Sequence, residues 1–158
     1  MKIHQLWETN QYFTMFELTF SSEAVRDLDR STLSYIQKKS VEANSKMGVT
    51  GCLFFHKNKF MGILEGREEE VEKLFAKIKK DNNHKNISVL AKEQIMDRQF
   101  KHWNMISCMK EEKRQGKADY HLSVENTLAL IEFAEKRNYG SRVFWLAVKE
   151  SLEKGNSF

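Results

Sequence analysis

The side chains that could carry catalysis or bind a metal are 5 histidines, 2 cysteines and 22 acidic residues. The histidines fall on different predicted elements, and no spacing of His, Cys and Asp resembles a metal site. No nucleophile has a general base beside it, and the glutamates at 68–70 are explained by favourable electrostatics at a helix start. A pair of catalytic carboxylates is the one arrangement left open, so the sequence favours a protein that is not an enzyme.

Both cysteines, Cys52 and Cys108, lie in apolar segments without a CxxC spacing. This is typical of buried thiols in a reducing compartment rather than of a disulfide. No apolar run approaches the roughly 18 residues of a membrane span, and the first residues, MKIHQLWETNQ, lack the apolar middle of a secretion signal. We therefore expect a cytoplasmic protein that does not enter a membrane.

The net charge of +4 comes from 26 Lys and Arg against 22 Asp and Glu. Basic and acidic residues are interleaved along segments such as 68–81 and 110–119, which is typical of solvated helix faces. Nucleic-acid binding calls for clustered positive charge, so we expect no nucleic-acid partner. The length of 158 residues fits one folded domain with a short appendage.

The first half of the chain alternates between strand and helix patterns. A strand is predicted within 12–20, where Phe16, Leu18 and Phe20 share one face and polar residues the other, as in a half-buried strand. A helix follows, with Ser31 as its N-cap. Its apolar face carries Leu33, Ile36, Ala43 and Met47.

The middle of the chain predicts a hairpin, a second helix and two further strands. Residues 49–56 and 60–66 flank a short polar turn at 57–59, which predicts antiparallel neighbours. From Glu68 to Asp81 the pattern is that of an amphipathic helix. Its apolar positions are Val71, Leu74, Phe75 and Ile78. Residues 86–95 predict a fourth strand, and residues 104–109 a fifth.

The resulting order, β-α-β-β-α-β, predicts an α+β ferredoxin-like sandwich with an extra strand, in which two helices cover one face of the sheet. The opposite face needs a cover. Segments 123–138 and 141–154 both have helical spacing, so we expect a C-terminal helical hairpin packed on the sheet or on a partner. The predicted domains are 12–110 for the sheet domain and 111–158 for the linker and hairpin.

Four motifs occur in an order and spacing that resemble the BLUF family of flavin-binding blue-light sensors. They are NSKMGVTGCLFF from Asn44, FMGILEG from Phe60, DNNH from Asp81, and FKHWNM from Phe100, which Arg98 precedes. The resemblance covers about ninety-five residues, from about Phe16 to Met109. It implies the fold derived above and a flavin, FAD or FMN, as cofactor.

The resemblance also implies roles for five residues. Asn44 would hydrogen-bond the flavin ring, and Ile36 and Ile78, one from each helix, would sandwich the isoalloxazine. Asp81 and His84 would contact the ribityl or phosphate end. Each position also has a structural reading, with Asn44 as a helix cap, the two isoleucines as core residues and His84 as a solvated side chain, and the residues alone do not choose between the two.

Three positions depart from the family pattern. In light-sensing members, a tyrosine on the first strand donates an electron and a proton to the excited flavin, and a glutamine on the third strand links that tyrosine to the flavin. Here the two positions hold Phe20 and Gly62, and the arginine of the family's Asp-x-Arg-His motif is Asn83. A phenyl ring has no O–H, and glycine has no amide. We expect the usual light switch to be lost and Gly62 to leave a gap beside the ligand.

These observations favour a degenerate BLUF protein with a sensory or regulatory role that acts through a protein partner or self-association, as a homo-oligomer. Phe133, Phe144 and Trp145 are expected to form an exposed apolar patch for this purpose. The alternative is a flavin-binding photoreceptor with altered photochemistry, in which Trp103 replaces the missing tyrosine as electron donor.

Overall fold

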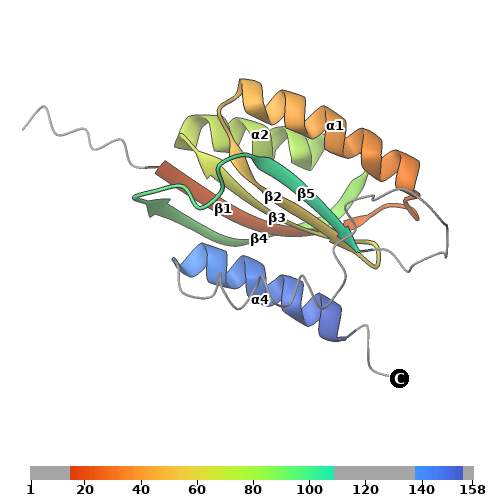
Figure 1. Ribbon diagram of the computed structural model, residues 1–158. Helices are drawn as coiled ribbons and strands as arrows, with labels where there is room; N and C mark the ends of the chain where they lie inside the picture. Colours follow the sequence, from red (N-terminus) through yellow and green to blue (C-terminus); the bar gives the residue numbers. More distant parts are fainter. Residues whose placement is uncertain (1–14, 109–137, 155–158) are drawn as a thin grey trace, which may run out of the picture.

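The computed structural model describes residues 15–108 and 138–154 (Figure 1). The elements in chain order are β1 (Met15–Ala24), α1 (Arg30–Lys46), β2 (Thr50–His56), β3 (Lys59–Gly66), α2 (Glu68–Lys80), β4 (His84–Ile95), β5 (Trp103–Cys108) and α4 (Tyr139–Glu153). This order confirms the predicted α+β ferredoxin-like arrangement with an extra strand. Of the predicted C-terminal hairpin, the second helix is α4; the first lies, apart from Asn138, outside the described residues.

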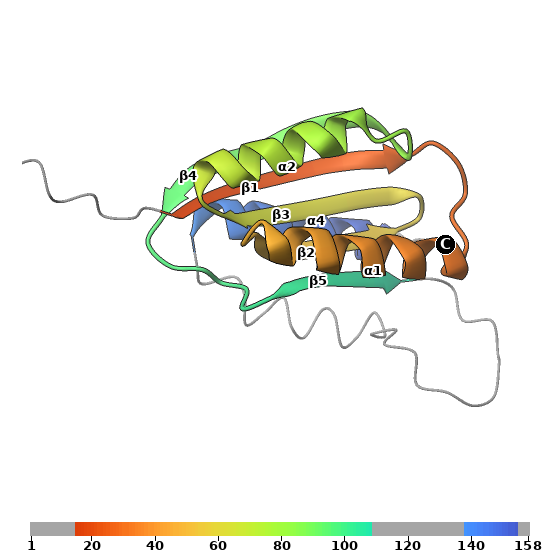
Figure 2. The same ribbon diagram turned by 90° about the horizontal axis from the view of Figure 1, so that it is seen from above.

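The five strands form one sheet in the order β4-β1-β3-β2-β5. Neighbouring strands are antiparallel except β2 and β5, which run parallel. Helices α1 and α2 lie side by side on one face, and α4 lies on the other (Figures 1 and 2). The domain therefore has three layers, and the sheet has a core on each side.

The two cores contain different residues. Between the sheet and the helix pair lie the aromatic and aliphatic side chains that include Phe20, Phe60 and Leu64. Between the sheet and α4 lie Cys52, Phe54, Met61, Ile63, Phe144, Trp145, Val148 and Leu152. Because β3 is central, its residues alternate between the two cores with the period of a strand.

Strand β1 is buried on both faces, so the prediction of a half-buried strand was wrong. Phe16, Leu18 and Phe20 face the helix pair as expected, but Glu17 and Thr19 on the opposite face are also buried. Their burial follows from the position of α4 across β1, β3 and β4. An alternating pattern reports the polarity of a face but not whether another element covers it.

Local signals set the ends of the elements. The β2–β3 turn has two residues, Lys57 and Asn58, with φ of 46° and 61°, as in the type I′ turns that suit a two-residue hairpin. The N-cap of α1 is Asp29 rather than the predicted Ser31: Asp29 Oδ1 accepts hydrogen bonds from Thr32 N at 2.8 Å and from Ser31 Oγ at 2.9 Å. The carboxylate lies before the helix, where it can reach the free backbone N–H groups.

The predicted exposed patch near the C-terminus was also wrong for the residues that are described. Phe144 and Trp145 are buried against the sheet, where they pack with Phe100 at ring-centroid distances of 6.5 and 6.4 Å. Phe133 lies outside the described residues. Phe144 and Trp145 thus attach α4 to its own sheet. No helix among the described residues has the length and apolar character needed to cross a membrane.

Candidate functional site

A groove of about 470 Å³ opens between α1 and α2, above the middle of the sheet. All five residues predicted from the sequence line it: Ile36 and Asn44 on α1, Ile78 on α2, Asp81 just after α2, and His84 at the start of β4. The volume lies within the range of small-molecule sites. The structure thus brings the five residues together, while their roles toward a ligand stay predictions.

The walls of the groove are apolar. Ile36 and Ile78 face it from opposite helices, and Phe20, Leu53 and Leu74 also line it. Both isoleucines are partly buried and pack against the core on the helix side of the sheet. Two helices that lie side by side, with aliphatic side chains on their facing sides, form a slot that suits a flat aromatic ring.

Asn44 supplies a polar group inside this slot. It lies in the last turn of α1 and is only 3% exposed. Its backbone C=O accepts from Met47 N and Val49 N at 3.2 and 3.0 Å, so the backbone of Asn44 forms the helix end. Its side-chain amide makes no hydrogen bond to another residue in the described ranges. A buried amide normally has a partner, and this one has both donor and acceptor groups free for a bound ring.

The far end of the groove carries Asp81 and His84. Asp81 Oδ1 accepts from the backbone N–H and the side-chain amide of Asn83, both at 2.9 Å. His84 Nδ1 lies 2.7 Å from Ser22 Oγ, and its ring packs on Phe60 with a centroid distance of 4.6 Å. Burial lowers the pKa of His84, although the nearby Asp81 opposes this effect. His84 is therefore a positioned, neutral ring at neutral pH rather than a solvated side chain.

Three basic side chains at this groove were missed in the sequence. Arg26, Lys39 and Lys77 line it together with the predicted residues. Spacing was a usable signal for two of them, because Lys39 follows Ile36 by three positions and Lys77 follows Leu74 by three, so each pair shares one helical surface. Asn83 is uncharged, but these three side chains bring positive charge to the groove, where a phosphate would bind favourably.

Phe20 lines the base of the groove, and its ring lies against Gly62. The two residues lie directly opposite each other on β1 and β3, and Phe20 is fully buried. A Cβ built on Gly62 would fall on atoms Cε1 and Cζ of the Phe20 ring. The expected gap at Gly62 is therefore wrong: the phenyl ring already occupies that space, and it also contacts Phe75, with ring centroids 5.4 Å apart.

Trp103 lines the groove next to α1. Its indole Nε1–H donates to Ser40 Oγ at 2.9 Å, and the side chain is 7% exposed. Because Trp103 begins β5, which pairs with β2, this hydrogen bond connects the edge strand to α1. Met105, which follows on the same strand, is partly buried against the same core.

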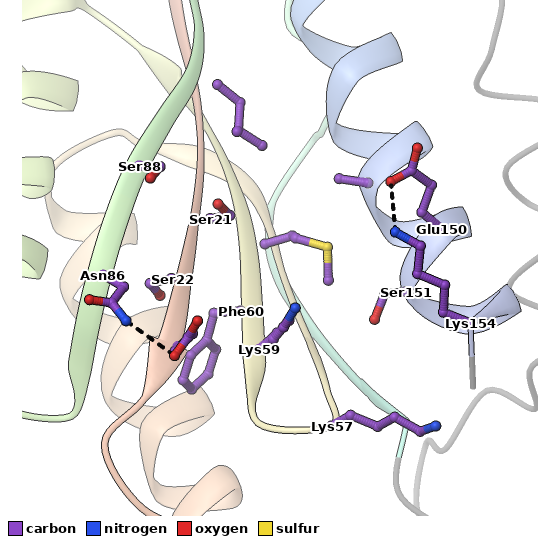
Figure 3. Close-up of a pocket in the computed structure, with 14 residues that line it drawn as sticks. Ser21, Ser22, Lys57, Lys59, Phe60, Asn86, Ser88, Glu150, Ser151 and Lys154 are labelled. Carbon is purple, nitrogen blue, oxygen red and sulfur yellow. Dashed lines mark hydrogen bonds and ion pairs between the residues drawn. The ribbon is translucent and has the colours of Figure 1, made fainter.

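A second hollow, of about 520 Å³, lies on the other face, between the C-terminal half of α4 and strands β1, β3 and β4 (Figure 3). Lys57, Lys59 and several serines line it. Its acidic residues already have partners, since Glu23 accepts from Asn86 and Glu150 pairs with Lys154. Among the described residues, no group of three or more His, Cys, Asp or Glu could hold a metal ion. The groove between α1 and α2 is thus the better candidate site.

The groove fits a flavin. Its walls accept a flat ring, the unused amide of Asn44 can bond to the polar edge of that ring, and its basic side chains suit a phosphate. Ile36, Ile78 and Asn44 would hold the ring system, and Asp81 and His84 would lie near the remainder of the molecule. Phe20 and Gly62 supply no side-chain hydrogen-bonding group to the groove.

Comparison with known proteins agrees with this assignment. Residues 15–106 match the family model described as BLUF, sensors of blue-light using FAD. Over 99 residues the chain is 28% identical to photoactivated adenylate cyclase subunit beta of Euglena longa and 27% identical to that of Euglena gracilis. The match covers 62% of this chain but 12% of each relative, so the cyclase activity of those proteins is not carried over to this chain.

Solved structures with the same fold include a bacterial light-regulated adenylyl cyclase, with 33% identity and a TM-score of 0.59 over 63% of this chain and 30% of that chain. The photo-activated state of BlsA is 26% identical, with a TM-score of 0.59 over 87% of this chain and 94% of that chain. The BLUF structure of BlrP1, at 21% identity and a TM-score of 0.66 over 92% and 95% of the two chains, shows the fold alone. The chain belongs to the BLUF family, whose members are sensory modules that use a flavin.

Proposed function

We propose that this protein is a regulatory BLUF module that binds FAD or FMN between α1 and α2, lacks the usual blue-light switch, and acts through contact with another protein or a second copy. The observation that carries the loss of the switch is the contact between Phe20 and Gly62. A buried phenyl ring takes the place of the polar pair through which the light-sensing members respond.

The chemistry of this pair explains the loss. A bound flavin supplies blue-light absorption. The strands beneath it must then supply groups whose hydrogen bonds can change, and an amide is suited to this because it both donates and accepts. Phe20 and Gly62 offer neither a side-chain donor nor a side-chain acceptor. The other groups at the groove, Asn44, His84 and Trp103, surround the slot but do not replace the missing link between β1 and β3.

An absorption spectrum tests the cofactor proposal. Purified protein incubated with FAD or FMN and then desalted should keep the flavin bands. Ile36→Arg places a charged side chain in the slot and should abolish retention, whereas Val41→Arg, on an exposed part of the same helix, should not. Colourless wild-type protein after this treatment would contradict the proposal.

Illumination tests the loss of the switch. The flavin-loaded protein should give no reversible light-minus-dark difference spectrum. A slow, irreversible bleaching that Trp103→Phe abolishes would instead support the alternative of altered photochemistry, because Trp103 lines the groove and is held by Ser40. A fast reversible shift in the wild-type protein would contradict both.

The outer surface of α4 supports the proposed interaction. Tyr139 and Leu146, two turns apart, are 66% and 56% exposed, so both side chains are accessible to a partner. If α4 mediates self-association, the wild-type mass in solution should exceed that of one chain, and Leu146→Lys should reduce it. If the protein is a monomer in solution and recovers no protein partner in a pull-down, the proposed action through protein contact is contradicted. The cytoplasmic location and the domain bounds 12–110 and 111–158 also stay predictions.

A further inference from the structure

Three glutamates lie in a row across the sheet face that α4 covers. Glu17 on β1 is directly opposite Glu65 on β3 and directly opposite Glu93 on β4. Like charges at directly opposed strand positions repel each other. Glu17 and Glu65 are also buried, with exposed fractions of 1% and 0%. Such an arrangement is stable only if the charges are neutralised or hydrogen-bonded.

The first turn of α4 lies directly on this row. Asn138, the N-cap of α4, donates from Nδ2 to Glu17 Oε2 at 3.3 Å, and the backbone N–H of Gly140 donates to Glu93 Oε1. Thr19 Oγ1 on β1 donates to the C=O of Gly140 at 3.2 Å. A Cβ at Gly140 would collide with Glu17 Oε1, so the glycine permits this close approach. The carboxylates therefore hold the start of the helix on the sheet.

The three carboxylates differ in the hydrogen bonds that they accept. Glu65 accepts backbone N–H bonds from Gln99 and Phe100 at 2.9 to 3.1 Å, and Glu93 accepts from Gly140. By contrast, Glu17 Oε1 is buried without a hydrogen-bond partner among the described residues. A carboxylate oxygen in that position is costly, whereas a protonated one can donate to the neighbouring Glu65.

The charged groups around Glu17 favour the protonated form. Burial raises the pKa of Glu17 to about 8; the hydrogen bond from Asn138 opposes this rise, and the charges of Glu65 and Glu93 add to it. The positive charge of Arg98 acts on Glu65, where it lowers a pKa that burial raises. From α4, only the uncharged Asn138 and Gly140 bond to the row, and Arg142 in the same turn is exposed.

We propose that Glu17 is a proton-controlled latch for α4: with its proton the start of α4 stays docked on the sheet, and loss of that proton loosens it. This inference does not depend on a bound flavin. In the undocked state water reaches Glu17 and restores its ordinary pKa of 4.5, whereas in the docked state the value is about 8. Between these values the docked state binds more protons, so docking weakens as pH rises.

The sign and size of the effect follow from one proton. The stabilisation of docked α4 by the Glu17 proton is complete below the ordinary pKa of 4.5. It decreases between pH 4.5 and about pH 8 and is lost at higher pH. Between these two pH values the ratio of docked to undocked α4 should fall by up to about tenfold per pH unit. Loosening α4 would expose to water part of the core beneath it, including Phe144 and Trp145.

Hydrogen exchange of the α4 amides tests the latch in the full chain. Rates are measured from about pH 5 to about pH 9 and divided by the unstructured-chain rate at each pH, so that the remaining protection reports opening. Wild-type protection should fall with pH. Glu17→Gln, which mimics the protonated acid and keeps a donor, should remain protected throughout, and Glu153→Gln, on the exposed surface of α4, should behave like the wild type.

Two results would overturn the latch. One is wild-type protection that does not change with pH, and the other is a Glu17→Gln variant that keeps the full pH dependence. A direct measurement guards against a variant that does not fold: the carboxyl carbon of Glu17 should titrate in the wild-type protein with a midpoint near 8. A midpoint at the ordinary value of 4.5 would show that the latch does not exist.

Discussion

At the scale of single residues, the ring of Phe20 packs directly on Gly62. The family resemblance predicted a lost hydroxyl and amide at these positions, which stays a prediction, and it also predicted a gap at Gly62, which the structure contradicts. The error has a physical cause. Whether a neighbour fills the space above a glycine depends on the register between strands, here Phe20 opposite Gly62, and register is not visible in one strand's sequence.

This packing predicts that the effects of substitutions at positions 20 and 62 on the free energy of unfolding are not additive. Gly62→Ala places a methyl group on the Phe20 ring, which cannot move freely because it also packs on Phe75. Overpacking of this kind should lower the free energy of unfolding by about 1–3 kcal/mol. In a Phe20→Leu background the methyl group has more room, so the same substitution should cost less. Urea unfolding of the four proteins in this double-mutant cycle measures the difference.

The matched control is Gly48→Ala. Gly48 has a positive φ of 66° but no neighbour within reach of a new Cβ. Its substitution should cost about 1 kcal/mol through backbone strain alone, and this cost should be the same with Phe20 or Leu at position 20. If the cost of Gly62→Ala is equally insensitive to position 20, the contact does not determine the packing at this site.

At the scale of elements, α1 and α4 each begin with a side-chain cap, and these two caps have different surroundings. Asp29 starts α1 in an exposed place and bonds to Ser31 and Thr32. Asn138 starts α4 next to a row of glutamates and bonds to Glu17, Ser141 and Gln99. Asp and Asn are about equally good N-caps in general, so surroundings should decide which of them is tolerated.

Substituting each cap residue with the other cap's residue type tests whether the surroundings decide which cap is tolerated. Asn138→Asp adds a fourth carboxylate and removes the amide donor to Glu17, which should destabilise docked α4 by about 2 kcal/mol near neutral pH. The loss should be smaller near pH 5, where the carboxylates are more easily protonated. Asp29→Asn should leave the stability of α1 almost unchanged. Hydrogen exchange of the amides of α1 and α4 measures both changes in stability. If both substitutions change helix stability equally, the surroundings of the caps do not decide which residue is tolerated.

The elements themselves were largely predictable from the sequence. The helix at 68–81 and the hairpin at 49–66 were predicted close to their observed bounds, because apolar periodicity and turn residues are local signals. The five groove residues were found through family motifs. The three basic side chains at the groove were missed although helical spacing offered a signal for Lys39 and Lys77. The row of Glu17, Glu65 and Glu93 was missed because it forms only through the pairing of three strands.

At the scale of the whole molecule, one sheet separates two cores. The ligand groove lies above the sheet with Trp103, and the α4 interface lies below it with Trp145. Strand β1 contributes to both, since Phe20 faces the groove and Glu17 faces α4. Because both cores share the strands of the sheet, we expect the two cores to unfold as one unit while α4 is docked.

Truncation of an α4 anchor tests this cooperativity. Phe144 is fully buried, so Phe144→Ala should lower the free energy of unfolding by about 3–5 kcal/mol, whereas Leu146→Ala, on the exposed side, should change it by less than about 0.5 kcal/mol. Unfolding is followed near pH 6, where docking is strong, in variants that retain only Trp103 or only Trp145. Both reporters should give one midpoint, and Phe144→Ala should shift both equally. A shift confined to the Trp145 signal would mean that α4 unfolds by itself, and the layer beneath the sheet would then be an independent unit rather than part of the domain's core.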